Sequence, residues 1–165
     1  MERLFVPLQK KTRPFFNPAS PVQDVFSGVL SPEERAFFRE RDCQNIGRWA
    51  EDKAAAFLAE QGLKILGRNV RERFSELDIV CKDGRELAVI EVRCRRKNSL
   101  MSSLDTIGPL KWRSLTRGAE LFVMRTGWTG AWRIDLIAFD VDCEKWSLHW
   151  HKYLEMDGGL DLNGR

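Results

Sequence analysis

The chain has 165 residues, of which 43% are hydrophobic and 31% are charged, and its formal net charge is +3. These values are typical of one globular domain with an extension, and the mild charge neither requires nor excludes nucleic-acid binding. No segment reaches the roughly 18 apolar residues of a membrane span, and no N-terminal pattern indicates a signal peptide. The four cysteines show no C-x-x-C spacing, so we expect a cytoplasmic protein with no membrane association.

The first 45 residues form a predicted N-terminal extension. Prolines at positions 7, 14, 18 and 21 interrupt any periodic pattern, so residues 1–30 are expected to be poorly structured. Ser31 suits a helix N-cap, Pro32 suits the first turn and Glu34 completes a capping box. This pattern predicts a short helix over about residues 32–41.

The main domain is predicted over residues 46–155, with a tail at residues 156–165. A helix is expected over residues 47–62, because four apolar residues lie at helical spacing: Ala50, Ala54, Phe57 and Leu58. The later elements are, in order, a strand over about 63–74, a hairpin over 75–95, a helix over 108–127 and strands over 131–140 and 145–153. The order α-β-β-β-α-β-β predicts an α/β fold with a central mixed β-sheet flanked by helices.

The predicted hairpin, SELDIVCKDGRELAVIEVRCR, sorts its charged residues onto one face. Side chains alternate across a strand, and opposed residues of an antiparallel pair point to the same side. One face is therefore apolar throughout: Leu77, Ile79, Cys81, Ala88, Ile90, Val92 and Cys94. The other face is apolar near the tip and charged at its open end, where it carries Glu76, Asp78, Glu91 and Arg93. A two-residue loop and a four-residue loop both give this division.

Asp78 and Glu91 are directly opposed if the loop has four residues, with Cβ atoms about 4.5–5.5 Å apart. Like charges at that separation repel, and a hard divalent cation with oxygen ligands, Mg²⁺ or Mn²⁺, would remove the repulsion. The alternative is a solvated face on which the carboxylates form weak ion pairs with neighbouring arginines. The β-forming neighbours of Glu91 and the apolar tip favour a covered site, where a carboxylate needs a cation or hydrogen bonds.

Several short motifs occur in the order of a known family. They are GRWAED at 47–52, RNVR at 68–71, SELDIV at 75–80, VIEVRCR at 89–95, Lys111, and RIDLI at 133–137. Together they resemble the restriction-endonuclease-like superfamily of PD-(D/E)xK phosphodiesterases. More closely, they resemble the YraN-like family of bacterial endonuclease-like proteins, over roughly residues 46–140.

The resemblance implies a restriction-endonuclease-like fold and metal-dependent hydrolysis of phosphodiester bonds. Asp78 and Glu91 match the ligands of Mg²⁺ or Mn²⁺, Glu51 matches a third catalytic carboxylate, and Arg93 matches the lysine beside the attacking water. Two positions depart from the pattern: Ser75 replaces a glycine, and arginine at position 93 cannot act as a general base because it keeps its proton. The implied partner is nucleic acid, DNA rather than RNA, and analogy with small nucleases suggests a homodimer.

Basic residues around the hairpin are candidate contacts to a nucleic-acid backbone: Arg71, Arg95, Arg96, Lys97 and Lys111. A solvated basic loop explains the same residues equally. Arg133 and Asp135 share one strand face, where they could bridge to neighbours. His149 and His151 share another face, on a predicted edge strand, and lack a third ligand for a metal ion.

Three functional hypotheses remain open. The chain could be a metal-dependent nuclease acting on DNA or structured nucleic acid, or a nucleic-acid-binding module on the same fold with weak or no catalysis. Arginine at position 93 favours the second. The third is a partner-binding protein that acts through the aromatic residues of its extension. Metal binding separates the first hypothesis from the others.

Overall fold

A computed structural model describes residues 23–73, 75–96 and 107–154. Its strands are β1 (Gln23–Val29), β2 (Lys64–Glu72), β3 (Ser75–Asp83), β4 (Glu86–Arg96), β5 (Trp132–Val141) and β6 (Lys145–His151). They form one sheet of order β1-β6-β5-β4-β3-β2. β4 and β5 are parallel and the other neighbours are antiparallel. The mixed sheet confirms the predicted α/β class and is compatible with a restriction-endonuclease-like fold.

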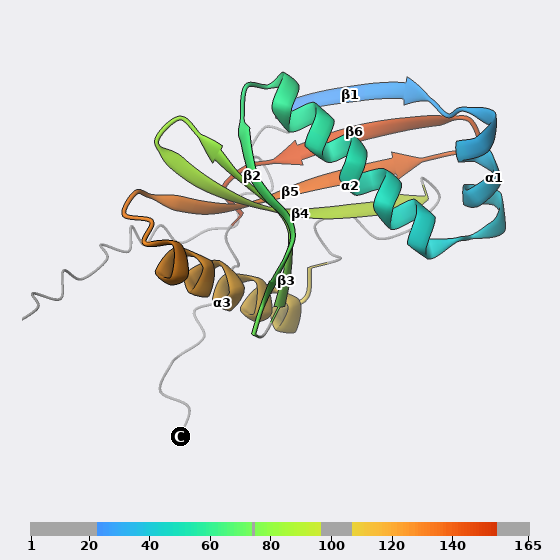
Figure 1. The fold of residues 1–165 in the computed structure, drawn as a ribbon. Coiled ribbons are helices and arrows are strands. Elements are labelled where there is room, and N and C mark those ends of the chain that lie inside the picture. Colours follow the sequence, from blue (N-terminus) through green and yellow to red (C-terminus); the bar gives the residue numbers. More distant parts are fainter. Residues whose placement is uncertain (1–22, 74, 97–106, 155–165) are drawn as a thin grey trace, which may run out of the picture.

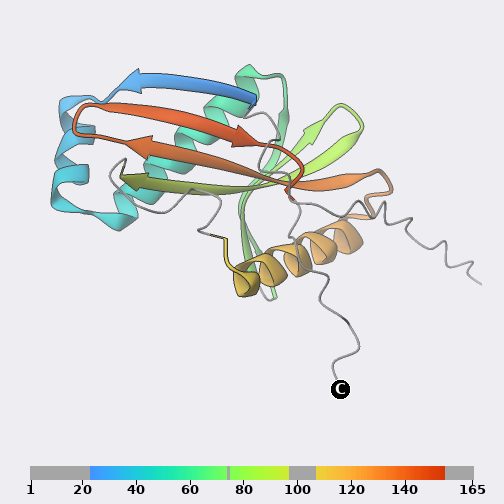
Figure 2. The same cartoon turned by 180° about the vertical axis from the view of Figure 1, so that it is seen from behind.

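The helices are α1 (Pro32–Glu40), α2 (Cys43–Glu60) and α3 (Pro109–Thr126). α2 lies across one face of the sheet, and α3 lies near β3 on the other side (Figures 1 and 2). α1 and α2 share one apolar core with the sheet, and α3 packs on a second core. No helix in the described ranges is both long and apolar enough to cross a membrane.

The sequence of α2 explains its start and its buried face. Asp42 caps the helix by accepting a hydrogen bond from the Asn45 N–H at 3.1 Å, so the helix begins four residues before the predicted start. The predicted apolar stripe is buried under it, as its helical spacing indicated. Gly62 follows the helix with φ +83°, a conformation that glycine adopts without strain.

The described part of the N-terminal extension, from residue 23, contributes to the same sheet and core, and the expectation of little structure is wrong for residues 23–29. These residues form β1, which pairs with β6 from Gln23↔Trp150 to Val29↔Lys145. The prolines that suggested disorder all precede β1. Apolar and polar residues alternate only weakly within β1, so the sequence pattern did not indicate a strand. The predicted helix is confirmed as α1, with the Ser31 and Glu34 capping box in place. Residues 1–22 and 155–165, including the predicted tail, lie outside the described residues.

The hairpin adopts the register in which Lys82 pairs with Leu87, and its ladder runs to Ile79↔Ile90. Beyond that pair β3 leaves β4 and runs toward α3, whereas β4 continues beside β5 (Figure 1). The predicted apolar face packs in the core under α2, except for Leu77, which packs in the core under α3. The face of Leu77 was predicted wrongly because β3 twists at Asp78, where simple alternation ends. The two strands thus form a fork around Asp78 and Glu91.

Candidate active site

Glu91 lies at the fork between β3 and β4 and is only 1% exposed. Its Oε1 is 2.8 Å from Arg93 Nη2 and 3.0 Å from Lys111 Nζ. Its Oε2 is buried and has no hydrogen-bond partner in the part of the chain that the structure describes. A buried carboxylate oxygen left in this state is costly. A further donor or a cation would satisfy this atom.

Asp78 approaches the same site from β3. Its Oδ2 accepts a hydrogen bond of 2.8 Å from the Val92 N–H, so the carboxylate replaces the backbone acceptor that β4 loses where the ladder ends. Burial, followed by the charge of Glu91, raises the pKa of Asp78 to about 7, whereas the Val92 N–H and Lys111 oppose this rise. A carboxyl group with a pKa near neutrality is typical of functional sites.

Glu51 contributes a third carboxylate at the margin of the site. It projects from α2, and Asn69 of β2 donates a hydrogen bond from Nδ2 to Glu51 Oε2 at 3.0 Å. The charge of Glu51 also raises the pKa of Asp78. Asn69 has φ +49°, a left-handed conformation that costs a non-glycine residue about 1–3 kcal/mol. Sequence reasoning missed Asn69, whose only signal was its place inside the RNVR motif.

Asp78 and Glu91 are carboxylates, the type of ligand that a hard divalent cation takes. Mg²⁺ is usually held by one or two carboxylates, with waters and substrate oxygens completing its shell. The buried Oε2 of Glu91, which lacks a partner among the described residues, is the atom that such an ion would satisfy. Within residues 23–73, 75–96 and 107–154, no three His, Cys, Asp or Glu side chains form a group that could hold a metal ion. The chain would therefore supply two ligands and leave the other positions to water and substrate.

Lys111 belongs to the site itself, although the sequence suggested only a contact to nucleic acid. α3 begins at Pro109, which places Lys111 in the first turn and its Nζ 3.0 Å from Glu91 Oε1. Lys111 and Arg93 thus reach the same carboxylate oxygen from two different elements, α3 and β4.

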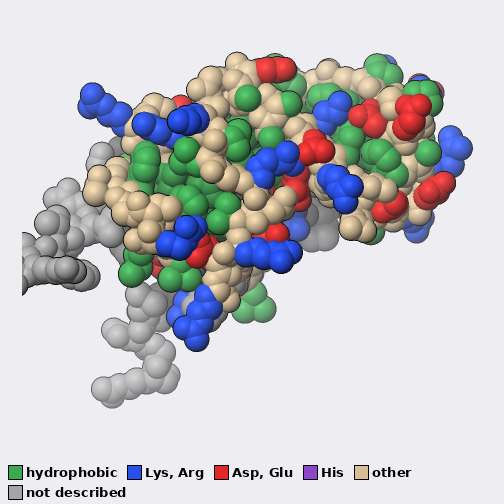
Figure 3. All heavy atoms as spheres, viewed as in Figure 1, with side chains coloured by type: hydrophobic (Ala, Val, Ile, Leu, Met, Phe, Trp, Pro, Cys, Tyr) green, Lys and Arg blue, Asp and Glu red, His purple; other side chains and the backbone are tan. Residues whose placement is uncertain are grey.

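The other basic candidates lie apart from one another. Arg71 is 85% exposed and 3.7 Å from Glu76, Arg95 pairs with Asp140, and Arg96 donates to the Phe38 carbonyl of α1. Strand alternation puts Arg95 and Arg96 on opposite faces of β4, and Lys97 lies outside the described residues. On the face seen in Figure 3, basic and acidic side chains are interspersed. The described residues therefore do not gather into one basic strip.

Arg133 and Asp135 form a buried network, as their shared face suggested. Arg133 is 5% exposed and Asp135 is fully buried, and their side chains are 3.0 Å apart. Arg133 also pairs with Asp83 at 2.8 Å and Glu86 at 2.7 Å. Asp135 accepts further hydrogen bonds from the Trp150 indole and the Tyr153 N–H. These contacts satisfy both charges and tie the hairpin tip to β5, a structural role.

His149 and His151 are half-buried on β6, which is not an edge strand because β1 covers it. His149 Nε2 lies 3.3 Å from Asp140 Oδ2 and 3.2 Å from Ser147 Oγ. Burial lowers the pKa of His151, and the neighbouring His149 adds to this effect. These contacts make His149 part of a polar cluster on β6 and not a metal site.

Comparison with known proteins places the site inside a matched segment. A family model described as "Uncharacterised protein family UPF0102" matches residues 50–139, which include Glu51, Asp78, Glu91 and Lys111. A "UPF0102 protein" of Anaeromyxobacter dehalogenans (strain 2CP-C) is 42% identical over 96 residues, 58% of this chain and 72% of the relative. Another, from Janthinobacterium sp. (strain Marseille), is 35% identical over 106 residues, 64% of this chain and 86% of the relative.

Proposed function

Because the chain belongs to the uncharacterised protein family UPF0102, the YraN-like family, we propose that it is a metal-dependent nuclease. Its substrate would be DNA or another structured nucleic acid, and its cofactor Mg²⁺ or Mn²⁺. The observation that carries the proposal is the buried Glu91 carboxylate, whose Oε2 has no partner among the described residues, at a fork shared with Asp78. All four cysteines are free thiols, which supports a reducing compartment such as the cytoplasm.

The site residues divide the work of phosphodiester hydrolysis. A bound divalent cation would supply polarisation of the scissile phosphate and a more acidic water. Asp78 and Glu91 would hold it, with Glu51 at the margin. Lys111 would orient Glu91 and stabilise negative charge as it develops, and Arg93 would hold the nonbridging phosphate oxygens. Arg93 is 38% exposed at its side chain, so it is within reach of a substrate.

A second candidate function is a nucleic-acid-binding module with weak or no catalysis. The observation that favours it is the double pairing of Glu91 Oε1, which lies within 3.0 Å of both Arg93 and Lys111. Two cations already balance the carboxylate that a metal ion would use. This pairing balances the charge of Glu91 without a metal, and the arginine and lysine would then serve to bind phosphate.

The two candidates are separated by titrating Mg²⁺ and Mn²⁺ in cleavage assays on single-stranded, duplex and branched DNA. Asp78→Ala and Glu91→Ala should each abolish metal-dependent cleavage. Glu76→Gln is the matched control, because this carboxylate lies on the same strand as Asp78 but its side chain is 47% exposed. Its ion pair with Arg71 is long, at 3.7 Å. Cleavage that persists in both fork variants would overturn the site. Salt-sensitive binding without cleavage in the wild type would establish the binding module instead.

A further inference from the structure

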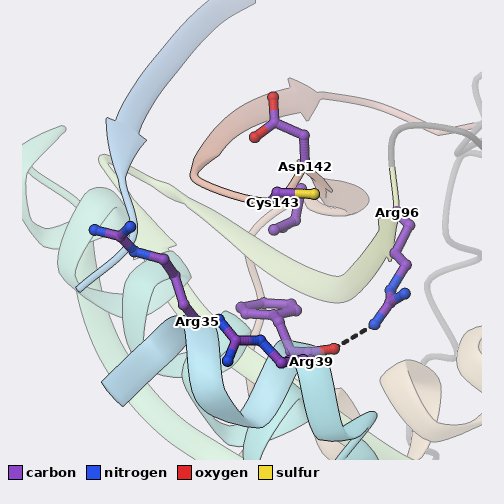
Figure 4. A pocket seen from close by; sticks show the side chains of 7 residues that line it. Arg35, Arg39, Arg96, Asp142 and Cys143 are labelled. Atoms are coloured by element: carbon purple, nitrogen blue, oxygen red, sulfur yellow. Dashed lines mark hydrogen bonds between the residues drawn. The ribbon is translucent and has the colours of Figure 1, made fainter. Parts of the chain in front are cut away.

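A separate hollow of about 530 Å³ opens where α1 meets the ends of β4 and β5. It is lined by Arg35, Phe38, Arg39, Arg96, Val141, Asp142 and Cys143. Figure 4 shows Arg35 and Arg39 on α1, Arg96 arriving from β4, and Cys143 in the turn opposite. Arg96 is five residues beyond Glu91 on β4, about 16 Å at about 3.3 Å per residue. The hollow is therefore distinct from the fork.

The hollow carries an excess of positive charge. Arg35 and Arg39 lie one helical turn apart, so they share a face of α1. Arg39 has no hydrogen bond or ion pair with any residue that the structure describes. Arg35 donates from Nε to the Leu30 carbonyl at 3.2 Å and lies 3.7 Å from Glu144. Arg96 uses one of its five donors on the Phe38 carbonyl. Three guanidinium groups thus retain donors for an anion.

Among the described residues, the lining contains one carboxylate, Asp142, against three arginines. Oδ1 of Asp142 accepts the backbone N–H groups of Glu144 and Lys145, at 2.9 Å and 2.7 Å. These bonds hold Asp142 in the turn between β5 and β6. Like charges gathered around a hollow repel one another, and a bound anion would remove that repulsion.

We propose that this hollow binds a phosphate-bearing molecule of nucleotide size. Guanidinium groups pair with phosphate through two parallel hydrogen bonds, a geometry that lysine cannot provide. Small-molecule sites usually measure about 300–1,000 Å³, so a hollow of about 530 Å³ is larger than phosphate alone requires. Phe38, Val141 and Cys143 supply apolar lining, which suits a flat body such as a nucleobase.

Most of this site comes from residues outside the segment that matches the family model. That segment spans residues 50–139, whereas α1 and the turn after β5 lie beyond it. Arg96 is the one described lining residue that lies within the matched segment. The site would therefore be a property of this chain and its extension, and it does not depend on catalysis at the fork.

Calorimetric titration in EDTA with adenosine 5′-monophosphate, adenosine and inorganic phosphate tests the proposal. The monophosphate should bind with one-to-one stoichiometry, at least about tenfold more tightly than adenosine or phosphate. Arg39→Ala should weaken this binding about tenfold or more. Arg39 is exposed near the end of α1, and alanine favours helix, so the fold should persist. Arg85→Ala, at the exposed hairpin turn, is the matched control and should bind normally.

Any of three titration results would overturn the proposal: no binding of the monophosphate, equal binding by Arg39→Ala and the wild type, or equal affinity for phosphate and the monophosphate. Amide NMR shifts should locate the ligand near Arg39 and Cys143, and shifts confined to the fork would also overturn it. A 5′-phosphorylated oligonucleotide that displaces the monophosphate would identify a nucleic-acid end as the source of the phosphate. Failure to displace it would identify a free nucleotide. Because EDTA removes divalent ions, failure here leaves the nuclease proposal untouched.

Discussion

Asp78 is expected to lower the stability of the metal-free protein at neutral pH, and Asp78→Asn should remove this penalty. Burial and the charge of Glu91 raise the pKa of Asp78 from 3.8 to about 7. The ionised carboxyl is therefore less favourable in the folded protein than in the unfolded chain. Asparagine keeps the size of the side chain and can accept the Val92 N–H, which now donates to Oδ2 at 2.8 Å.

The magnitude follows from the difference in pKa. Between pH 3.8 and about 7 the folded protein holds a proton on Asp78 that the unfolded chain has released, so stability from this group falls as pH rises. Below this window the effect vanishes, and above it the loss is complete. The rise corresponds to at most about 4 kcal/mol at about 1.36 kcal/mol per pKa unit. Water at the partly exposed side chain reduces it, so we expect about 1–3 kcal/mol.

Urea unfolding in EDTA at pH 4.5 and pH 8, followed by tryptophan fluorescence, measures this gain. Asp78→Asn should be clearly more stable than the wild type at pH 8 and only slightly more stable at pH 4.5. The exposed control Glu76→Gln should match the wild type at both pH values. Adding Mg²⁺ should narrow the difference, because an ion held at the fork stabilises only the wild-type folded state. A variant no more stable than the wild type at pH 8, or an equal gain at both pH values, would refute the reasoning.

Three further substitutions probe other parts of the structure. Lys111→Arg keeps the charge but replaces the compact ammonium beside Glu91 Oε1 with a larger planar guanidinium, so metal-dependent cleavage should fall. An unchanged rate would exclude a specific role for the Lys111 ammonium. Gly118→Ala would place a Cβ 1.9 Å from Ser75 Oγ, which should cost about 1–3 kcal/mol in urea unfolding, and adding Ser75→Gly should restore part of it. Asp135→Ala should lower the free energy of unfolding by about 3–5 kcal/mol, because it deprives buried Arg133 of a partner. Thermal denaturation measures this change, and a loss below about 1 kcal/mol would contradict the role of the pair.

Periodicity was sufficient to predict most of the fold. The apolar stripe of α2, the alternation in the hairpin and the capping signals of α1 are local features, and each determines an element without knowledge of its neighbours. The observed register, with Lys82 opposite Leu87, is the one expected from the four-residue loop. Serine at position 75, where the family pattern has glycine, needs no left-handed backbone, because it lies in the extended strand β3 and is not among the described non-glycine residues with positive φ.

The arrangement of the site could not be predicted from local pattern. Alternation gives the face of a residue only while a strand stays regular, and β3 twists at Asp78, so Leu77 moved to the other core. Lys111 is distant in sequence from Glu91, and their contact depends on how α3 docks on the sheet. The support that Asn69 gives to Glu51 depends on a single left-handed backbone position. Each of these features follows from long-range packing.

Both outer strands of the sheet carry backbone irregularities. The pairing of β1 with β6 shifts register between Gln23 and Val25, and that of β2 with β3 shifts between Ile65 and Gly67. Such bulges disturb the regular row of N–H and C=O groups that a strand from another molecule would need for pairing. The sheet should therefore resist edge-to-edge growth and aggregation, and any homodimer is expected to form through helices or the sheet face.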